Sequence, residues 1–269
     1  VPGWLDSRTW ELALKNLGTL GGGNHFIEIQ RGEDGSAWLM LHSGSRNLGY
    51  RIASFHHRRA VDFDGRKKLF VPSKDLAYFP ADSDEGREYV RDMEFALEYA
   101  LENRRRMMHV LKEEFSAAFP EAAFLGEINI HHNYAALERH LGLDLWVHRK
   151  GATSAKEGET GIIPGSMGTA SYIVKGLGNP MSFTSCSHGA GRALGRSEAC
   201  RRLSIEACDR AMEGIVYDRW GRTGRGKKGG MADLSEAPAA YKDIDAVIRA
   251  ELDLVAPEVR LTPIGVIKG

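Results

Sequence analysis

The sequence contains few cysteines, no excess of charge of either sign and no long hydrophobic run. Its three cysteines, Cys186, Cys200 and Cys208, are an odd number without the spacing of a metal knuckle. That pattern argues against a disulfide scaffold and favours a reducing, cytoplasmic setting. Lys and Arg together number 36, as do Asp and Glu, so a generally basic nucleic-acid-binding chain is excluded, although a local basic cleft is not. Without a run of about 18 apolar residues, we expect no membrane span.

The first ten residues lack the basic start and the apolar core of a signal peptide, and they lack an initiator methionine. We therefore expect a fragment or a trimmed form of a longer protein. With 42% hydrophobic and 27% charged residues, the composition is that of an ordinary globular protein. A chain of 269 residues can bury a sizeable core without disulfides or metals.

Short strands and helices are expected to intermix without regular alternation. Residues 25–30 and 37–42 are typical of two strands around a turn at 32–35. Apolar residues at helical spacing predict one long helix from Asp84 to Phe115, capped by Ser83. The other expected elements are strands at 128–134, 145–148 and 162–163, a strand or helix at 171–174, helices at 197–213 and 241–255, and an extended tail at 259–268. This mixture predicts an α+β fold, with short-stranded sheets and packed helices around one core, as a single domain over residues 1–269.

Histidine is frequent, and four of the ten histidines stand beside Gly, Asn or Ser near the ends of predicted strands. They are His25, His42, His132 and His188. Side chains at strand ends can converge on one cleft, and imidazole is a good ligand for transition metals. A hydrogen-bonded structural role is the alternative for any one of them. Four histidines in glycine-rich surroundings nevertheless favour a shared, metal-capable site.

Two glycine-rich segments have the composition of phosphate-binding loops. Residues 164–171 (PGSMGTAS) combine small residues with hydroxyl groups, and residues 188–192 (HGAGR) set a histidine beside bare backbone and an arginine. Backbone N–H groups bind phosphate, and arginine adds a bidentate donor. Neither segment matches a Walker A loop or a dinucleotide fingerprint, so a tight structural turn remains the alternative for each. The residues by themselves predict a metalloenzyme that handles nucleotides or phosphoesters.

Seven motifs, in order along the chain, resemble the RtcB family of RNA-splicing ligases. They are GGNHFIE (22–28), LHSGSR (41–46), HHNY (131–134), RKGAT (149–153), PGSMGTASY (164–172), HGAGR (188–192) and PIGVIKG (263–269). The resemblance implies an RtcB-like fold and a catalytic domain. It also implies a GTP- and Mn²⁺-dependent RNA ligase that acts in tRNA splicing or RNA repair. Such an enzyme joins RNA 2′,3′-cyclic phosphate or 3′-phosphate ends to 5′-hydroxyl ends through a histidine–GMP intermediate.

The resemblance also implies individual roles. His188 would attack GTP and carry GMP, while His42 and His132 would share one Mn²⁺ ion and His25 would bind a second. The implied nucleotide-binding positions are Asn24, His25, Phe26, Ile27, Glu28, His132, Asn133, Pro164, Gly165, Ser166, Met167, Ser171, His188, Gly189, Ala190, Gly191, Tyr241 and Lys268. In this set Glu28 would accept hydrogen bonds from guanine, and Tyr241 is a candidate to stack on the base. The candidates for binding RNA phosphates are Arg46, Lys150, Arg192 and Arg196.

One part of the family pattern has no counterpart in this sequence. The Asp and Cys that complete the family's metal site, in a segment of Asp-x-Gly-Cys-Gly type, match nothing, since no cysteine precedes Cys186. We therefore expect weak metal binding and slow or absent ligation from this chain alone. The alternatives are a guanylyltransferase that only caps nucleic-acid 3′-phosphate ends, an inactive nucleotide- or RNA-binding member, and, less well supported, a metallophosphoesterase without GTP. The implied partners are RNA (tRNA halves or broken RNA), GTP and an activating archease-type protein.

Overall fold

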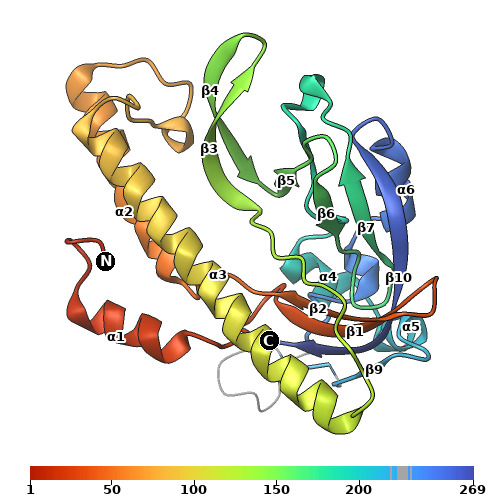
Figure 1. Cartoon of the computed structure of the whole chain (residues 1–269). Coiled ribbons are helices and arrows are strands. Elements are labelled where there is room, and N and C mark those ends of the chain that lie inside the picture. Colours follow the sequence, from red (N-terminus) through yellow and green to blue (C-terminus); the bar gives the residue numbers. More distant parts are fainter. Residues whose placement is uncertain (219, 223–229, 231) are drawn as a thin grey trace. The chain divides into compact units, whose positions relative to one another are not determined.

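The computed structural model describes residues 1–218, 220–222, 230 and 232–269 (Figure 1). Contacts within the chain group into two compact units, residues 1–21 with 43–122 and residues 22–42 with 123–269. Helices and curled antiparallel sheets confirm the predicted α+β class with short-stranded sheets. Each unit has its own buried apolar residues, so the single domain with one core stays a prediction.

The first unit contains three α-helices and one short 3-10 helix among its described elements. They are α1 (Ser7–Asn16), α2 (Leu48–Lys67), η1 (Lys74–Leu76) and α3 (Asp84–Ala118). The long helix α3 is confirmed, with Ser83 as its cap: the Ser83 hydroxyl accepts a hydrogen bond from Gly86 N at 3.0 Å. The helices α1 and α2 were not among the elements predicted from the sequence. The buried cluster of this unit is Ala13, Leu48, Ile52 and Tyr99.

The second unit is organised around a sheet with the strand order β2-β1-β10-β7-β6, and β9 pairs with β10 (Figure 1). Its strands are β1 (Phe26–Gly32), β2 (Ala37–His42), β6 (Thr160–Ile163), β7 (Ser171–Gly176), β9 (Val216–Tyr217) and β10 (Val255–Lys268). The predicted hairpin and the extended tail are confirmed by β1, β2 and β10. Residues 171–174, left open between strand and helix, begin β7. Because β10 pairs antiparallel with both β1 and β7, it brings the start of β1 and the start of β7 into one sheet.

Smaller elements complete the second unit. The strands β3 (Asn133–His140) and β4 (Leu143–Lys150) form a hairpin, and β5 (Ala152–Ser154) pairs with β8 (Ser185–Ser187). The helices are η2 (Pro180–Ser182), α4 (Arg196–Arg202), α5 (Ile205–Ala211), η3 (Pro238–Ala240) and α6 (Ile244–Ala250). The predicted strands at 145–148 and 162–163 lie within β4 and β6.

Three predicted boundaries are wrong. The strand expected at 128–134 starts only at Asn133, because pairing with β4 begins there. The helix expected at 197–213 is two helices, since Ser204 caps α5 by accepting a hydrogen bond from Ala207 N at 3.2 Å. The helix expected at 241–255 is the shorter α6, because Val255 already pairs with β7.

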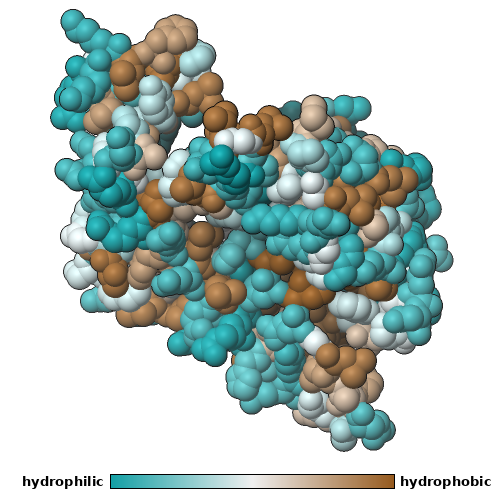
Figure 2. Space-filling model, turned by 45° about the horizontal axis from the view of Figure 1, so that its top comes forward, coloured by the Kyte–Doolittle hydropathy of each residue, from teal (hydrophilic) through white to brown (hydrophobic). Residues whose placement is uncertain are grey.

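Hydrophobic and hydrophilic residues alternate in small patches over the face shown in Figure 2. Apolar side chains gather instead inside the second unit, where Ile163, Val174 and Val255 belong to one buried cluster and Phe26 and Leu261 to another. Among the described residues, no helix combines the length and the apolar character needed to cross a membrane. Both clusters therefore draw on strands of the main sheet, with Ile163 in β6, Val174 in β7 and Leu261 in β10.

Candidate functional site

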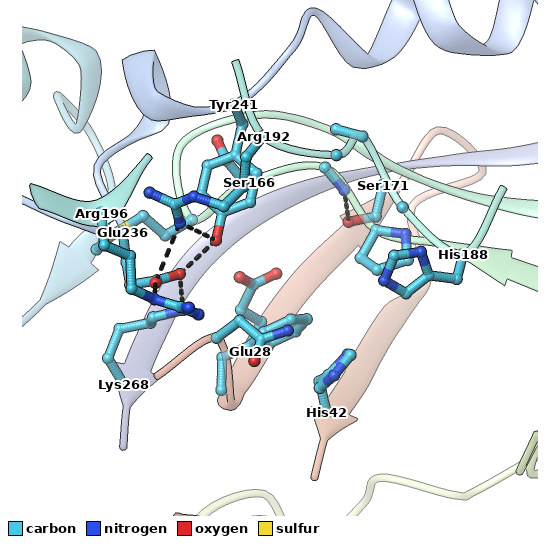
Figure 3. Close-up of a pocket in the computed structure, with 18 residues that line it drawn as sticks. Glu28, His42, Ser166, Ser171, His188, Arg192, Arg196, Glu236, Tyr241 and Lys268 are labelled. Atoms are coloured by element: carbon cyan, nitrogen blue, oxygen red, sulfur yellow. Dashed lines mark hydrogen bonds and ion pairs between the residues drawn. The ribbon is translucent and has the colours of Figure 1, made fainter. Parts of the chain in front are cut away.

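A cavity of about 260 Å³ lies in the second unit, where several strands begin or end (Figure 3). This volume is near the lower end of the range for small-molecule sites. Predicted nucleotide-binding residues line most of it: Asn24, Phe26, Glu28, Pro164, Gly165, Ser166, Met167, Ser171, His188, Gly189, Ala190, Gly191, Tyr241 and Lys268. The predicted metal ligand His42 and two predicted phosphate-binding residues, Arg192 and Arg196, also line the cavity.

Six predicted site residues are not among those that line the cavity: His25, Ile27, His132, Asn133, Lys150 and Arg46. The alternation of β1 explains Ile27, since Phe26 and Glu28 are buried on the cavity side and neighbouring residues of a strand face opposite ways. Arg46 belongs to the first compact unit, where its Nε donates to Thr19 Oγ1 at 3.0 Å. Lys150 ends β4, paired with Asn133. The assignment of all these residues to a nucleotide, metal or RNA site stays a prediction.

The four singled-out histidines lie next to one another. Ring centres are 5.7 Å apart for His25 and His42, and 4.9 Å apart for His42 and His132. The next pair, His132 and His188, is stacked at 5.3 Å. Residues that are far apart in the sequence therefore form a continuous row of imidazoles that reaches the cavity at His42 and His188.

The spacing and the charge state of this row of imidazoles suit the binding of a divalent metal ion, but the row does not form a complete ligand set. With imidazole nitrogens about 2.0–2.1 Å from a bound ion, two rings that share an ion have centres roughly 5 Å apart, which suits His42 and His132. Burial and the neighbouring His132 and His25 hold the pKa of His42 well below its usual value. His42 is therefore neutral at pH 7, with a lone pair available for a metal. Among the described residues, however, no group of three or more His, Cys, Asp or Glu side chains is placed to hold an ion.

His188 stands between two loops at the edge of the cavity. Burial and, to a smaller extent, Lys150 lower the pKa of His188, while a hydrogen bond with the Gly151 backbone opposes this. A neutral ring with one nitrogen in a hydrogen bond keeps a lone pair on the other nitrogen, which is the form that can act as a nucleophile.

The loops beside His188 are shaped by glycine. A side chain at Gly165 would place its Cβ 2.0 Å from Ala170 O, so only glycine lets this loop close on itself. Gly191 has φ +72°, in the region that favours glycine. The 188–191 segment is tied to the other loop by Ala190 N, which donates to Pro164 O at 2.9 Å. The two glycine-rich segments, residues 164–171 and 188–192, thus form one wall of the cavity.

Glu28 is a buried carboxylic acid in the cavity wall, with only 2% of its surface exposed. Burial raises the pKa of Glu28 from 4.5 to about 7, against the effects of a hydrogen bond from Gln30 and the charge of Lys268. Gln30 Nε2 donates to Glu28 at 2.5 Å and to Ser171 Oγ at 3.2 Å. Glu28 can therefore hold either a charge or a proton near neutral pH, and its neighbours favour the charge.

Cations of the cavity wall gather around one acid, Glu236, that was not among the residues predicted from the sequence. Glu236 accepts from Arg192 Nη1 at 3.2 Å and from Arg196 Nε at 3.0 Å, and it lies 3.7 Å from Lys268 Nζ (Figure 3). It also accepts a hydrogen bond from the Tyr241 hydroxyl. Because one carboxylate holds three cations at the cavity, the wall is poised to bind an anion such as phosphate.

Gln30 and Glu236 are the two contributors that sequence reasoning overlooked. A signal for Gln30 was present, since it follows Phe26 and Glu28 at every second position and so faces the same side of a strand. A polar pair on the buried face of a strand departs from the usual apolar pattern. Nothing local distinguishes Glu236, because its partners come from α4, β10 and the segments around Arg192 and Tyr241.

Comparisons with known proteins agree on one family. The family model described as tRNA-splicing ligase RtcB matches residues 2–269. The RNA-splicing ligase RtcB of Escherichia coli (strain K12) is 41% identical over 261 residues, which cover 95% of this chain and 62% of that protein. The Mycobacterium tuberculosis RNA-splicing ligase RtcB is 35% identical over 98% of this chain and 67% of its own length. The tRNA-splicing ligase RtcB of Methanopyrus kandleri is 36% identical over 97% of this chain and 31% of its own length.

Proposed function

The chain belongs to the RtcB family of tRNA-splicing ligases, and on that premise we propose that its cavity binds GTP and that His188 accepts GMP from it. We further propose that the complete protein joins RNA 2′,3′-cyclic phosphate or 3′-phosphate ends to 5′-hydroxyl ends, in tRNA splicing or RNA repair. The chain spans 62% of the length of its Escherichia coli relative, so this activity is proposed for the whole protein.

The observation that carries the proposal is the composition of the cavity that His188 lines. One wall has Glu28, whose carboxylate can accept from the N1–H and amino groups of guanine. Another wall has the cations Arg192 and Lys268, suited to the phosphates. His188 lines the same cavity, so a nucleotide bound there shares the cavity with the imidazole proposed to attack it.

Three transfers would follow. A lone pair on a His188 ring nitrogen attacks the α-phosphorus of GTP, the bond to the β-phosphate oxygen breaks, and pyrophosphate leaves with the bonding electrons. An oxygen of the RNA 3′-phosphate then takes GMP from His188, which recovers its lone pair. Finally the 5′-hydroxyl of the second RNA end attacks the phosphorus of the RNA 3′-phosphate, its proton passes to solvent, and the bond from that phosphorus to the GMP oxygen breaks, so that GMP leaves. A 2′,3′-cyclic phosphate is first opened by water.

Two groups of residues support these transfers. His42 and His132 are the residues proposed to hold one Mn²⁺ ion, and His25 a second, and the ions would offset phosphate charge and orient the attack. Arg192 and Arg196, both on the cavity wall, are proposed to meet RNA phosphate, and Lys150 and Arg46 complete that set. Glu236 keeps the guanidinium groups of Arg192 and Arg196 in place before the anions arrive.

The proposal extends to the protein's setting. Its substrates are RNA ends, as tRNA halves or broken RNA, and we include an archease-type protein as an activating partner. The three cysteines are free thiols, in keeping with a reducing cytoplasm.

The direct test is the intact mass of the complete protein after incubation with GTP and Mn²⁺. We expect a mass increment of one GMP, resistant to denaturation because the link is covalent. His188→Ala should lose the increment, whereas Ser182→Ala, an exchange outside the cavity, should keep it. An unchanged increment in His188→Ala would exclude His188 as the acceptor.

A gel assay with one RNA bearing a 2′,3′-cyclic phosphate and one bearing a 5′-hydroxyl tests the joining step. Covalent GMP together with joined RNA supports the ligase. Covalent GMP with GMP-capped but unjoined 3′ ends would support the guanylyltransferase instead. Nucleotide binding without any covalent GMP would point to an inactive binding member.

A further inference from the structure

Gln30 lies behind the cavity wall rather than in it. It is the third inward-facing residue of β1, after Phe26 and Glu28, and none of its surface is exposed. Its amide nitrogen donates to two side chains that do line the cavity, Glu28 at 2.5 Å and Ser171 at 3.2 Å. A single NH₂ group therefore contacts two buried polar residues of the cavity wall, both of them predicted nucleotide-binding positions.

These two hydrogen bonds determine which donor and acceptor atoms of Glu28 and Ser171 remain available to a ligand in the cavity. A carboxylate that accepts from Gln30 keeps its second oxygen as an acceptor facing the cavity. The Ser171 oxygen accepts from Gln30 and also from Gly165 N at 3.2 Å, so both its lone pairs are used. What Ser171 can still contribute is its hydrogen, as a donor.

The resulting pattern matches one base and not the other. Guanine presents N1–H and an amino group as donors, beside O6 as an acceptor, which complements an acceptor at Glu28 and a donor at Ser171. Adenine bound in the same orientation would instead turn its N1 acceptor toward the Glu28 acceptor and its amino donor toward the Ser171 donor. Mispaired polar groups in a buried site strongly disfavour binding, so this polarity is a basis for selection.

The opposite orientation of the Gln30 amide is disfavoured by its surroundings. It would place the amide oxygen 2.5 Å from the Glu28 oxygen, with no hydrogen between two acceptors unless Glu28 took up a proton. In the orientation described, the Gln30 oxygen is buried without a hydrogen-bond partner. An unsatisfied buried acceptor is costly, which suggests that this residue is kept for what its NH₂ group does.

We propose that Gln30 is a positioning residue for base selection, fixing Glu28 as an acceptor and Ser171 as a donor so that the cavity takes guanine rather than adenine. This inference rests on the proposed function, because it assumes that the base lies against these two residues. It adds a residue that the base does not touch. Gln30 is also the only glutamine of the chain, so its replacement leaves no other side chain of this kind to substitute for it.

The test compares GMP and AMP binding by calorimetry on the full chain and on Gln30→Met, which keeps the length of the side chain and removes both donors. Loss of a hydrogen bond to a charged group should lower GMP affinity about tenfold. AMP affinity should stay the same or rise, so the GMP-to-AMP affinity ratio falls. Ser154→Ala is the matched control: it deletes a partly buried side-chain hydrogen bond, from Ser154 to Glu159, in strand β5 outside the cavity.

A fall in the ratio of more than about threefold supports the inference. A smaller fall, or equal weakening of GMP and AMP as in a merely structural role, overturns it. Should Gln30→Met fail to fold, Gln30→Glu, which keeps the shape and replaces the donor with an acceptor, is judged by the same threshold. A wild-type chain without preference for GMP would instead contradict the proposed GTP site, so the two failures are distinguishable.

Discussion

Replacing Glu28 by glutamine should stabilise the fold while it removes guanine binding. The carboxyl group of Glu28 is 2% exposed, and burial raises its pKa from 4.5 to about 7. A carboxyl group whose pKa is raised by folding makes its full contribution to stability at pH values below its unfolded pKa. This contribution is lost as the pH rises through the folded pKa. From about pH 4.5 to above 7, ionisation of Glu28 should therefore cost the wild-type protein about 3 kcal/mol of unfolding free energy.

Glutamine at this position has no such cost, because it does not ionise. Its amide oxygen can still accept the hydrogen bond from Gln30, so the local contact is kept. The free energy of unfolding, measured by urea denaturation at several pH values, should thus favour Glu28→Gln over wild type increasingly from pH 5 to pH 8. In the same variant GMP affinity should fall about 100-fold, since a donor now faces the guanine donors.

Glu33→Gln is the matched control, since it makes the same exchange on the exposed turn of the same hairpin. Its stability difference from wild type at each pH is the reference against which the Glu28→Gln difference is compared. A Glu28→Gln variant whose stability difference changes with pH no more than this reference would show that the Glu28 carboxyl is not the titrating group. Undiminished GMP binding in that variant would remove Glu28 from the base site.

Two further predictions concern residues around the site. Arg149 is 1% exposed and forms two 2.9 Å hydrogen bonds to the Glu138 carboxylate. Arg149→Met leaves that carboxylate without its buried partner, so it should lower the free energy of unfolding, measured by urea denaturation, by about 3–5 kcal/mol. The double variant Arg149→Met/Glu138→Met should recover much of this loss. A double variant no more stable than the single one would contradict this. Gly165→Ala should weaken GMP binding, measured by calorimetry, by about tenfold or more, because the added Cβ would lie 2.0 Å from Ala170 O and force the loop open. Unchanged binding would show that this loop does not shape the cavity.

Elements governed by local sequence were predicted well. The helix α3 could be expected from its apolar spacing and from Ser83, whose hydroxyl caps the first turn in the structure. The β1–β2 hairpin follows from two short runs of strand-forming residues around a glycine-containing turn. The histidine and glycine-rich motifs likewise identified most of the residues that line the cavity.

Boundaries set by distant partners could not be read from the sequence. Residues 128–132 are as apolar and strand-like as their neighbours, but β3 begins at Asn133 because β4 offers its first pairing residue there, at Lys150. The end of α6 depends in the same way on β7, which takes Val255 into the sheet. The break at Ser204 did have a local signal, since serine is a preferred cap, but the apolar pattern runs through it.

The motifs named His188, Glu28 and Lys268, but only tertiary structure set them around one cavity and supplied Gln30 and Glu236. A side chain that acts by orienting another one has no motif of its own, because its effect depends on a distance that folding creates. The raised pKa of Glu28 is of the same kind, since it arises from burial by residues far away in the sequence. Residue types and spacing thus determine which chemistry is available, and packing decides the charge, the polarity and the neighbours with which that chemistry operates.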